Sequence, residues 1–165
     1  MGARVFTTCG TAEKAAFCRS LGADVVINYR ENDFVDVIKQ ESLGAGADII
    51  LDNMGSLYMA RNMEASAMDG QIVVIGLQGG KAAGIDLSIM MEKRMSLHVT
   101  SLRDRPLSER ARILKGVQRD IWPMVSEGLL RPVVDRVFPF DDVIDAHRHA
   151  ESVVQKGKVL LQLCN

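Results

Sequence analysis

The stretch Arg4-Val5-Phe6-Thr7-Thr8-Cys9-Gly10-Thr11-Ala12-Glu13-Lys14 decides the fold. Its first six residues predict a strand, and Gly10 and Thr11 predict a turn that opens directly into a helix. This order is typical of the second strand and second turn of a dinucleotide-binding α/β domain, yet no Gly-rich first turn precedes it. We therefore expect the first βα unit, which would hold a pyrophosphate, to be absent from the chain.

Short apolar runs alternate with amphipathic segments along the chain. The runs predict strands at residues 5–8, 24–28, 48–52, 72–75 and 97–100. Between them we expect helices at 11–21, from 32 or 33 to 41, and at 56–70. Strands that are apolar on both faces suit a parallel sheet covered by helices, so the pattern predicts a doubly wound, Rossmann-type α/β sheet with helices on both faces.

The last third of the chain follows a different pattern. We expect a helix at 108–128 bent near Pro123, a strand at 133–138, a helix at 141–153 and a strand at 158–163. We interpret residues 1–165 as a single partial dinucleotide-binding domain, the C-terminal part of a longer protein. Within it, the segment 129–165 would pack on the missing domain of that longer protein, which the family resemblance given below implies to be catalytic.

Composition restricts the partners of the chain. The 165 residues are 47% hydrophobic, and 20 basic residues nearly balance 21 acidic ones. No global field therefore favours nucleic acid or an anionic membrane as a partner. The cysteines Cys9, Cys18 and Cys164 lack the spacing of a zinc site or disulfide framework, and no apolar run is long enough to span a bilayer. We predict a cytoplasmic protein.

The turn after the first strand predicts the choice of cofactor. An acidic residue there would bind a free ribose 2′-hydroxyl, whereas a 2′-phosphate needs neutral donors and a cation. Thr11 offers a hydroxyl and the first amides of the helix, and Lys14 lies one turn into that helix. This favours NADPH over NADH. The alternative is that Thr11 is only a helix cap and Lys14 a solvated side chain.

Other candidate contacts follow later strands. Tyr29 could stack on or donate to a 2′-phosphate and Arg30 could add charge, although both also suit an ordinary surface. The run Asp52-Asn53-Met54-Gly55 and the glycine in Ile75-Gly76-Leu77 would let backbone approach a nicotinamide ribose. A cap for Asp52 and plain turn chemistry for Gly76 are the alternatives.

Several strings, in order and spacing, resemble the zinc-free quinone oxidoreductases of the zeta-crystallin type, within the medium-chain dehydrogenase/reductase family. They are Gly10-Thr11-Ala12-Glu13-Lys14, Leu21-Gly22-Ala23-Asp24-Val25-Val26-Ile27-Asn28-Tyr29-Arg30-Glu31, Asp52-Asn53-Met54-Gly55 and Val74-Ile75-Gly76-Leu77-Gln78-Gly79-Gly80. Later strings, Arg94-Met95-Ser96-Leu97, Thr100-Ser101-Leu102-Arg103-Asp104-Arg105 and Pro132-Val133-Val134-Asp135-Arg136-Val137-Phe138-Pro139, are most similar to its tumour-suppressor-inducible branch.

The resemblance implies NADPH-dependent, zinc-independent hydride transfer to a quinone or enone. It implies cofactor contacts at Gly10, Lys14, Tyr29 and Gly76-Leu77, to which the residues themselves add Thr11 and Asn53. The family's catalytic domain and first βα unit are absent, so we name no catalytic residue and expect the chain alone to be inactive. A non-catalytic nucleotide-binding or regulatory module remains an alternative. An S-adenosylmethionine-dependent methyltransferase is disfavoured because Thr8 and Cys9 stand where its acidic residue is expected.

Histidine spacing argues against a metal site. His147 and His149 lie two apart on an expected helix and face different directions, whereas a zinc pair on a helix prefers a spacing of four. We therefore predict no metal ligands in the chain.

The strand order has a consequence for assembly. In the dinucleotide fold the absent first strand is central, between the strands at 5–8 and 48–52. Either these strands pair with each other, or another chain or segment fills the gap, or the chain is part of a longer protein. The strand Leu97-His98-Val99-Thr100 would form the far edge, so we also predict a homodimer through it.

Overall fold

The computed structural model describes residues 2–152 and 154–163, in two compact units that divide between Asp104 and Arg105. The first unit alternates strands and helices, as the sequence pattern predicts. Its elements are β1 (Phe6–Cys9), α1 (Ala12–Ser20), β2 (Val25–Asn28), α2 (Phe34–Glu41), β3 (Ala47–Asp52), α3 (Met59–Ala65), β4 (Ser66–Val74), α4 (Leu87–Lys93) and β5 (Ser96–Val99).

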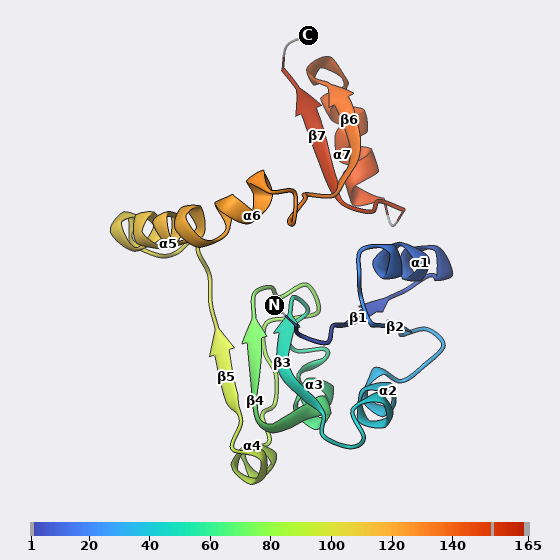
Figure 1. Ribbon diagram of the computed structural model, residues 1–165, viewed down its shortest axis with the longest axis vertical. Helices are drawn as coiled ribbons and strands as arrows, with labels where there is room; N and C mark the ends of the chain where they lie inside the picture. The colour runs from blue at the N-terminus through green and yellow to red at the C-terminus, as the bar shows by residue number, and fades with distance from the viewer. Residues whose placement is uncertain (1, 153, 164–165) are drawn as a thin grey trace. The chain divides into compact units, whose positions relative to one another are not determined.

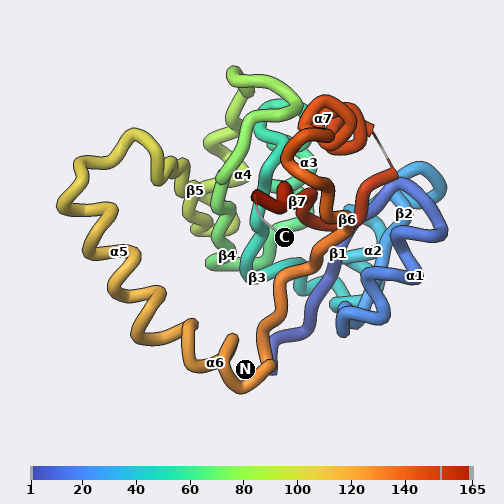
Figure 2. The backbone as a smooth tube through the Cα atoms, turned by 90° about the horizontal axis from the view of Figure 1, so that it is seen from above, coloured from blue at the N-terminus to red at the C-terminus, as the bar shows by residue number. Residues whose placement is uncertain are grey.

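All the strand pairs of the first unit are parallel, but they belong to two sheets. One sheet has the order β1-β2, with Thr7 opposite Val26, and the other has the order β3-β4-β5, with Ile50 opposite Ile72. Figure 1 shows β3, β4 and β5 side by side and pointing the same way, and Figure 2 follows the chain from β1 to β4. The predicted parallel α/β class is confirmed. Direct pairing of β1 with β3, one of the three alternatives, is absent from the described residues, because β3 pairs only with β4.

Two apolar clusters hold helices α2, α3 and α4 on the strands of this unit. In one cluster Ile27 of β2 packs with Phe34, Val35 and Ile38 of α2 and Ala65 of α3. In the other, methionines 59, 63 and 95 surround Ile72 and Val74 of β4, which are 0% and 3% exposed. Ile50 of β3 packs against both clusters and so connects them. The flexible methionine side chains of the second cluster suit this packing, because they fill irregular gaps between helices and strands.

Helix α3 is shorter than the sequence predicts. The expected helix at 56–70 spans only Met59–Ala65, and residues from Ser66 onward are extended and pair with Ala47. The Lys93 ammonium ends α3 by donating to the carbonyl oxygens of Met63, Glu64 and Ser66 at 3.0, 2.8 and 2.8 Å. A cation that binds the last carbonyls of a helix also complements the helix dipole. This long-range cap, rather than Gly70, decides where the helix stops.

The second unit contains α5 (Leu107–Asp120), α6 (Trp122–Ser126), β6 (Val134–Pro139), a 3-10 turn (Phe140–Asp142), α7 (Val143–Glu151) and β7 (Lys158–Gln162). The predicted bend near Pro123 is confirmed, because the helix breaks at Ile121 and Pro123 lies in the first turn of α6. Strands β6 and β7 are parallel neighbours, joined through α7. Of the predicted features, Val153 and Cys164 lie outside the described residues.

Among the helices in the described part of the chain, none has both the length and the apolar character needed to cross a membrane.

Candidate functional site

The first group of predicted site residues lies where β1 ends and α1 begins. Thr11 is the N-cap residue of α1, with extended backbone angles, and its hydroxyl oxygen accepts a hydrogen bond from the Lys14 amide at 3.2 Å. The Cys9 thiol donates to the Thr11 carbonyl oxygen at 3.6 Å, which ties the strand end to the cap. Thr11 therefore caps α1, as predicted. Thr11 is exposed, and the start of a helix favours an anion.

Tyr29 and Arg30 lie over Gly10. The Tyr29 amide donates to the Cys9 carbonyl oxygen at 3.0 Å and so fixes the end of β2 beside the end of β1. A Cβ atom on Gly10 would lie 2.5 Å from the Tyr29 hydroxyl oxygen and 3.4 Å from Arg30 Nε. Only glycine at position 10 lets the Tyr29 ring occupy this space. The structure thus brings Tyr29 to the segment that contains Gly10, Thr11 and Lys14.

The second group, Asn53, Gly76 and Leu77, lies in two loops at the carboxyl ends of β3 and β4. The Gln78 amide donates to the Asn53 carbonyl oxygen at 3.2 Å, and the Gly79 amide donates to the Met54 carbonyl oxygen at 2.7 Å. A Cβ atom on Gly76 would lie 2.7 Å from the Asn53 carbonyl oxygen, so glycine is required for this close approach. The two loops form a hydrogen-bonded pair with an exposed Leu77 beside Gly76.

Asp52 supports the first of these loops from within. Its carboxylate is buried and accepts from the Met54 amide at 2.7 Å and from the Gly55 amide at 3.1 Å. An aspartate that accepts from backbone amides two and three residues on is a common turn-former. The cap interpretation of Asp52 is the one that the structure bears out.

Sequence reasoning missed one residue that shapes the site. The Ser56 hydroxyl donates to the Gly79 carbonyl oxygen at 3.1 Å, and the Ser56 amide donates to the Gly80 carbonyl oxygen at 3.2 Å. Ser56 was expected to begin a helix, and its partners lie more than twenty residues away. No local signal could have indicated this role.

The two groups belong to different sheets, since Gly10 and Tyr29 follow β1 and β2, whereas Asn53 and Gly76 follow β3 and β4. Both groups nevertheless occupy carboxyl ends of parallel strands, where open α/β sheets bind ligands. The group after β3 and β4 offers backbone and small side chains, and the group after β1 and β2 offers hydroxyl and cationic groups. Such a site suits an extended ligand with an anionic end.

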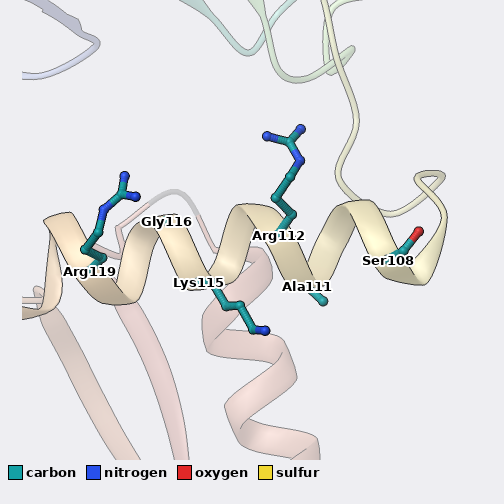
Figure 3. A pocket seen from close by; sticks show the side chains of 6 residues that line it. All are labelled: Ser108, Ala111, Arg112, Lys115, Gly116 and Arg119. Carbon is teal, nitrogen blue, oxygen red and sulfur yellow. The ribbon is translucent and has the colours of Figure 1, made fainter.

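A depression on α5 does not add to this site. Its lining includes Ser108, Arg112, Lys115 and Arg119, all from one helix. Figure 3 shows Arg112 and Arg119 pointing to one side of the helix and Lys115 to the other, so the cations do not converge. In the part of the chain that the structure describes, no three His, Cys, Asp or Glu side chains are placed to hold a metal ion.

The fold and the loop glycines define the cofactor-binding domain of an oxidoreductase, of the medium-chain dehydrogenase/reductase type. Residues 21–161 match the family model described as zinc-binding dehydrogenase, and the chain belongs to that family. This confirms the resemblance that the sequence strings indicated.

Relatives and solved structures agree on the class. The chain is 29% identical over 163 residues to quinone oxidoreductase 1 of Escherichia coli, covering 98% of this chain and 50% of that protein. A crystal structure of E. coli quinone oxidoreductase complexed with NADPH superposes with a TM-score of 0.81 at 28% identity, over 98% of this chain and 50% of that one. An NAD-dependent alcohol dehydrogenase superposes with a TM-score of 0.79 at 29% identity, over 99% and 45%. The chain therefore spans about half the length of these proteins.

Proposed function

We propose that the chain is the NADPH-binding part of a zinc-independent quinone oxidoreductase. When bound, the nicotinamide would supply a hydride, and the acceptor would be a quinone or an enone. The observation that carries the proposal is the close approach of the Tyr29 hydroxyl and Arg30 to Gly10 beside the capped start of α1, which gathers hydroxyl, amide and cationic groups at one strand end. The name of the E. coli relative supports the choice of acceptor.

The residues fit the phosphorylated cofactor better than the unphosphorylated one. At the end of β1 stand Thr8 and Cys9, so no carboxylate is placed to accept from a ribose 2′-hydroxyl. Gly10 lets the Tyr29 hydroxyl lie against the backbone at the start of α1, and Thr11 and Lys14 add the donors that a 2′-phosphate requires. Because both an NADPH complex and an NAD-dependent enzyme resemble the chain in fold, these side chains, rather than the fold, support NADPH.

In this proposal each loop has a part in binding. Gly10, Thr11, Lys14 and Tyr29 would hold the adenosine ribose and its 2′-phosphate, and Asn53, Gly76 and Leu77 would border the nicotinamide ribose. The paired loops at Asn53 and Gly76 present main chain rather than bulky side chains, so the ribose could approach closely. No metal enters the proposal, and the chain supplies no residue that we assign to proton transfer.

The chain alone should bind NADPH weakly and turn over no quinone, because pyrophosphate amides and a catalytic cleft are features of segments outside it. Cofactor binding followed by nicotinamide fluorescence, with NADPH and NADH compared, tests the cofactor. Oxidation of NADPH in the presence of a simple quinone, followed by nicotinamide absorbance, tests the acceptor. Equal affinity for the two cofactors would overturn the NADPH assignment, and rapid quinone-dependent oxidation by the chain alone would show that the site is misplaced.

We further propose that the protein is cytoplasmic and forms a homodimer through β5. Strand β5 lies at the outer edge of its sheet, and its Val99 side chain is 69% exposed. An exposed apolar edge strand tends to pair with another strand, and a two-fold axis would pair it with its own copy. Light scattering on the chain and on a Val99→Lys variant tests this, since a lysine on an edge strand opposes pairing. A wild-type chain that stays monomeric at high concentration would overturn the dimer.

A further inference from the structure

Arg30 stands out among the arginines of the first unit by what surrounds it. The Arg30 Nε atom lies 3.4 Å from the place that a Cβ atom on Gly10 would occupy. The Tyr29 hydroxyl oxygen lies 2.5 Å from the same place. Adjacent residues of a strand point to opposite faces, but Tyr29 and Arg30 lie in the turn after β2, where the Glu31 amide donates to the Asn28 carbonyl oxygen at 3.0 Å. The turn therefore brings two neighbouring side chains to one place.

The backbone of Arg30 is fixed while its guanidinium is available. The Arg30 amide donates to the Asn28 side-chain oxygen at 3.2 Å. Across residues 2–152 and 154–163, the guanidinium of Arg30 makes no ion pair or hydrogen bond, whereas Arg61 pairs with Asp33 and Arg94 pairs with Asp69, both at 2.6 Å. Arg30 is exposed, so its charge is solvated and can be reached by a ligand.

We propose that Arg30 is a specificity-determining residue, the second cation for the 2′-phosphate of the cofactor. The inference rests on the proposed NADPH site and names a residue that would make it selective. A guanidinium presents a planar fork of donors that matches two phosphate oxygens, whereas the Lys14 ammonium acts as a point charge. Lys14 lies in the first turn of α1, directly after β1, and Arg30 lies in the turn after β2, the strand paired with β1; in this proposal a phosphate bound at these two strand ends contacts both cations. A 2′-hydroxyl would gain little from Arg30, because it carries no charge.

Two acidic residues lie close in sequence to these cations. Glu13 lies in the first turn of α1 and Glu31 follows Arg30 in sequence. Both are exposed, and surface ion pairs of this kind contribute little in water. A doubly charged phosphate held at once by the start of α1, Lys14 and Arg30 would be favoured over solvent.

The experiment measures binding rather than turnover, with probes that separate the phosphate from the rest of the cofactor. Nuclear magnetic resonance of the 165-residue chain follows the amides of Thr11, Lys14 and Arg30 and the Arg30 Nε–H group during titration with 2′-AMP and, separately, with 5′-AMP. The variants are Arg30→Ala and Arg30→Lys. The matched control is Arg19→Ala, which removes one positive charge from the exposed far end of α1.

We expect the wild-type chain to bind 2′-AMP more tightly than 5′-AMP, and Arg30→Ala to weaken 2′-AMP binding by about tenfold or more while changing 5′-AMP binding by less than about twofold. The affinity of Arg30→Lys for 2′-AMP should lie between those of the wild type and Arg30→Ala, and the affinity of Arg19→Ala should resemble that of the wild type. If the wild type prefers 2′-AMP and Arg30→Ala leaves that preference intact, this inference is overturned and the proposed cofactor stands. If the wild type shows no preference for 2′-AMP, the NADPH assignment fails together with the role of Arg30.

Discussion

The Tyr29 hydroxyl oxygen lies 2.5 Å from the place that a Cβ atom on Gly10 would occupy. Side-chain oxygen and substituent carbon do not approach so closely, so the ring and a side chain at position 10 exclude each other. Because Tyr29 is 46% exposed, the ring could move outward instead of destabilising the fold. The contact therefore acts on the shape of the site more than on stability.

The first prediction concerns Gly10→Ala. The new methyl group should displace the Tyr29 ring and weaken NADPH binding, while the free energy of unfolding changes by about 0.5 kcal/mol or less, because the displaced ring is exposed and can move outward. Titration with NADPH and thermal unfolding of the same samples check both parts. Gly116→Ala is the control, because Gly116 lies within α5 with no atom within 4 Å of its added Cβ. That change should stabilise the helix by about 0.5–1 kcal/mol and leave binding unaltered.

The second prediction concerns Lys14→Ala. One charge-assisted contact to a phosphate contributes about 1.5–3 kcal/mol, so the variant should bind NADPH roughly ten- to hundredfold more weakly and NADH nearly as before. Fluorescence titration of both cofactors gives the ratio directly. Lys14→Arg keeps the cation and should retain most of the preference. Equal losses for the two cofactors would remove Lys14 from the 2′-phosphate site.

The third prediction concerns the turn that Asp52 supports. Asp52→Ala would leave the Met54 and Gly55 amides without their acceptor, and unpaired buried groups cost about 1–3 kcal/mol. Hydrogen exchange at these two amides should accelerate, and the loop pairing with Gly76 should loosen. Asp52→Asn keeps one acceptor oxygen, so its exchange rates at these amides should lie between those of the wild type and the alanine variant. Unchanged exchange in the alanine variant would show that the turn holds itself.

Local patterns predicted the parts of this structure that depend on neighbouring residues. Thr11 and Asp33 cap helices, as expected, because a short polar side chain before an apolar run satisfies the first free amides. Contacts between residues far apart in sequence determine the parts of the structure that local patterns did not predict. Asp69 and Arg94 both adopt left-handed backbone angles and form an ion pair at 2.6 Å, although neither segment indicates the other. In the site, the position of Tyr29 over Gly10 depends on the register of β1 with β2, which sequence spacing leaves open.

The fourth prediction is a pH dependence in the second unit. The His149 side chain, hydrogen-bonded to Asp135 at 2.5 Å, together with the Lys156 amide, lowers the pKa of Asp135 below its ordinary value of 3.8. A carboxyl whose folded pKa is depressed contributes stability that is complete above its unfolded pKa. That contribution is lost as the pH falls through the lower, folded value. Through the Asp135 carboxyl, the second unit should therefore lose stability only below about pH 4.

Asp135→Asn tests that dependence. The variant should be less stable than the wild type at neutral pH, and the difference should shrink as the solution is acidified below the ordinary pKa of the carboxyl. Thermal unfolding across an acid series, with the carboxyl carbon of Asp135 followed by nuclear magnetic resonance, gives both quantities. Asp145→Asn is the control, because Asp145 forms only an exposed pair with Arg148, which contributes about 0–1 kcal/mol. A carboxyl that titrates at its ordinary value would contradict the prediction.

The fifth prediction follows from the free edge of β3. The Ile75 amide donates to the Asp52 carbonyl oxygen at 2.7 Å, so Asp52 faces β4, and by alternation so does Ile50. Ile49 and Leu51 then direct their amides to the opposite edge, which has no strand partner among the described residues. Their side chains are each 68% exposed. In the isolated chain these two amides should exchange quickly with solvent, while that of Ile50 should be protected.

A strand that fills this edge, from another copy or from a further segment of a longer protein, would protect both amides. Filling by another copy would make the protection depend on concentration, whereas a segment in the same chain would protect at any concentration. Ile49→Lys places a charge on the edge and should abolish concentration-dependent protection without unfolding the sheet, since Ile49 lies outside the buried clusters. Ile72, in the central strand of the same sheet, provides the protected reference. Concentration-independent protection of Ile49 and Leu51 in the 165-residue chain would contradict an open edge and show that another segment of the same chain pairs with β3 in solution.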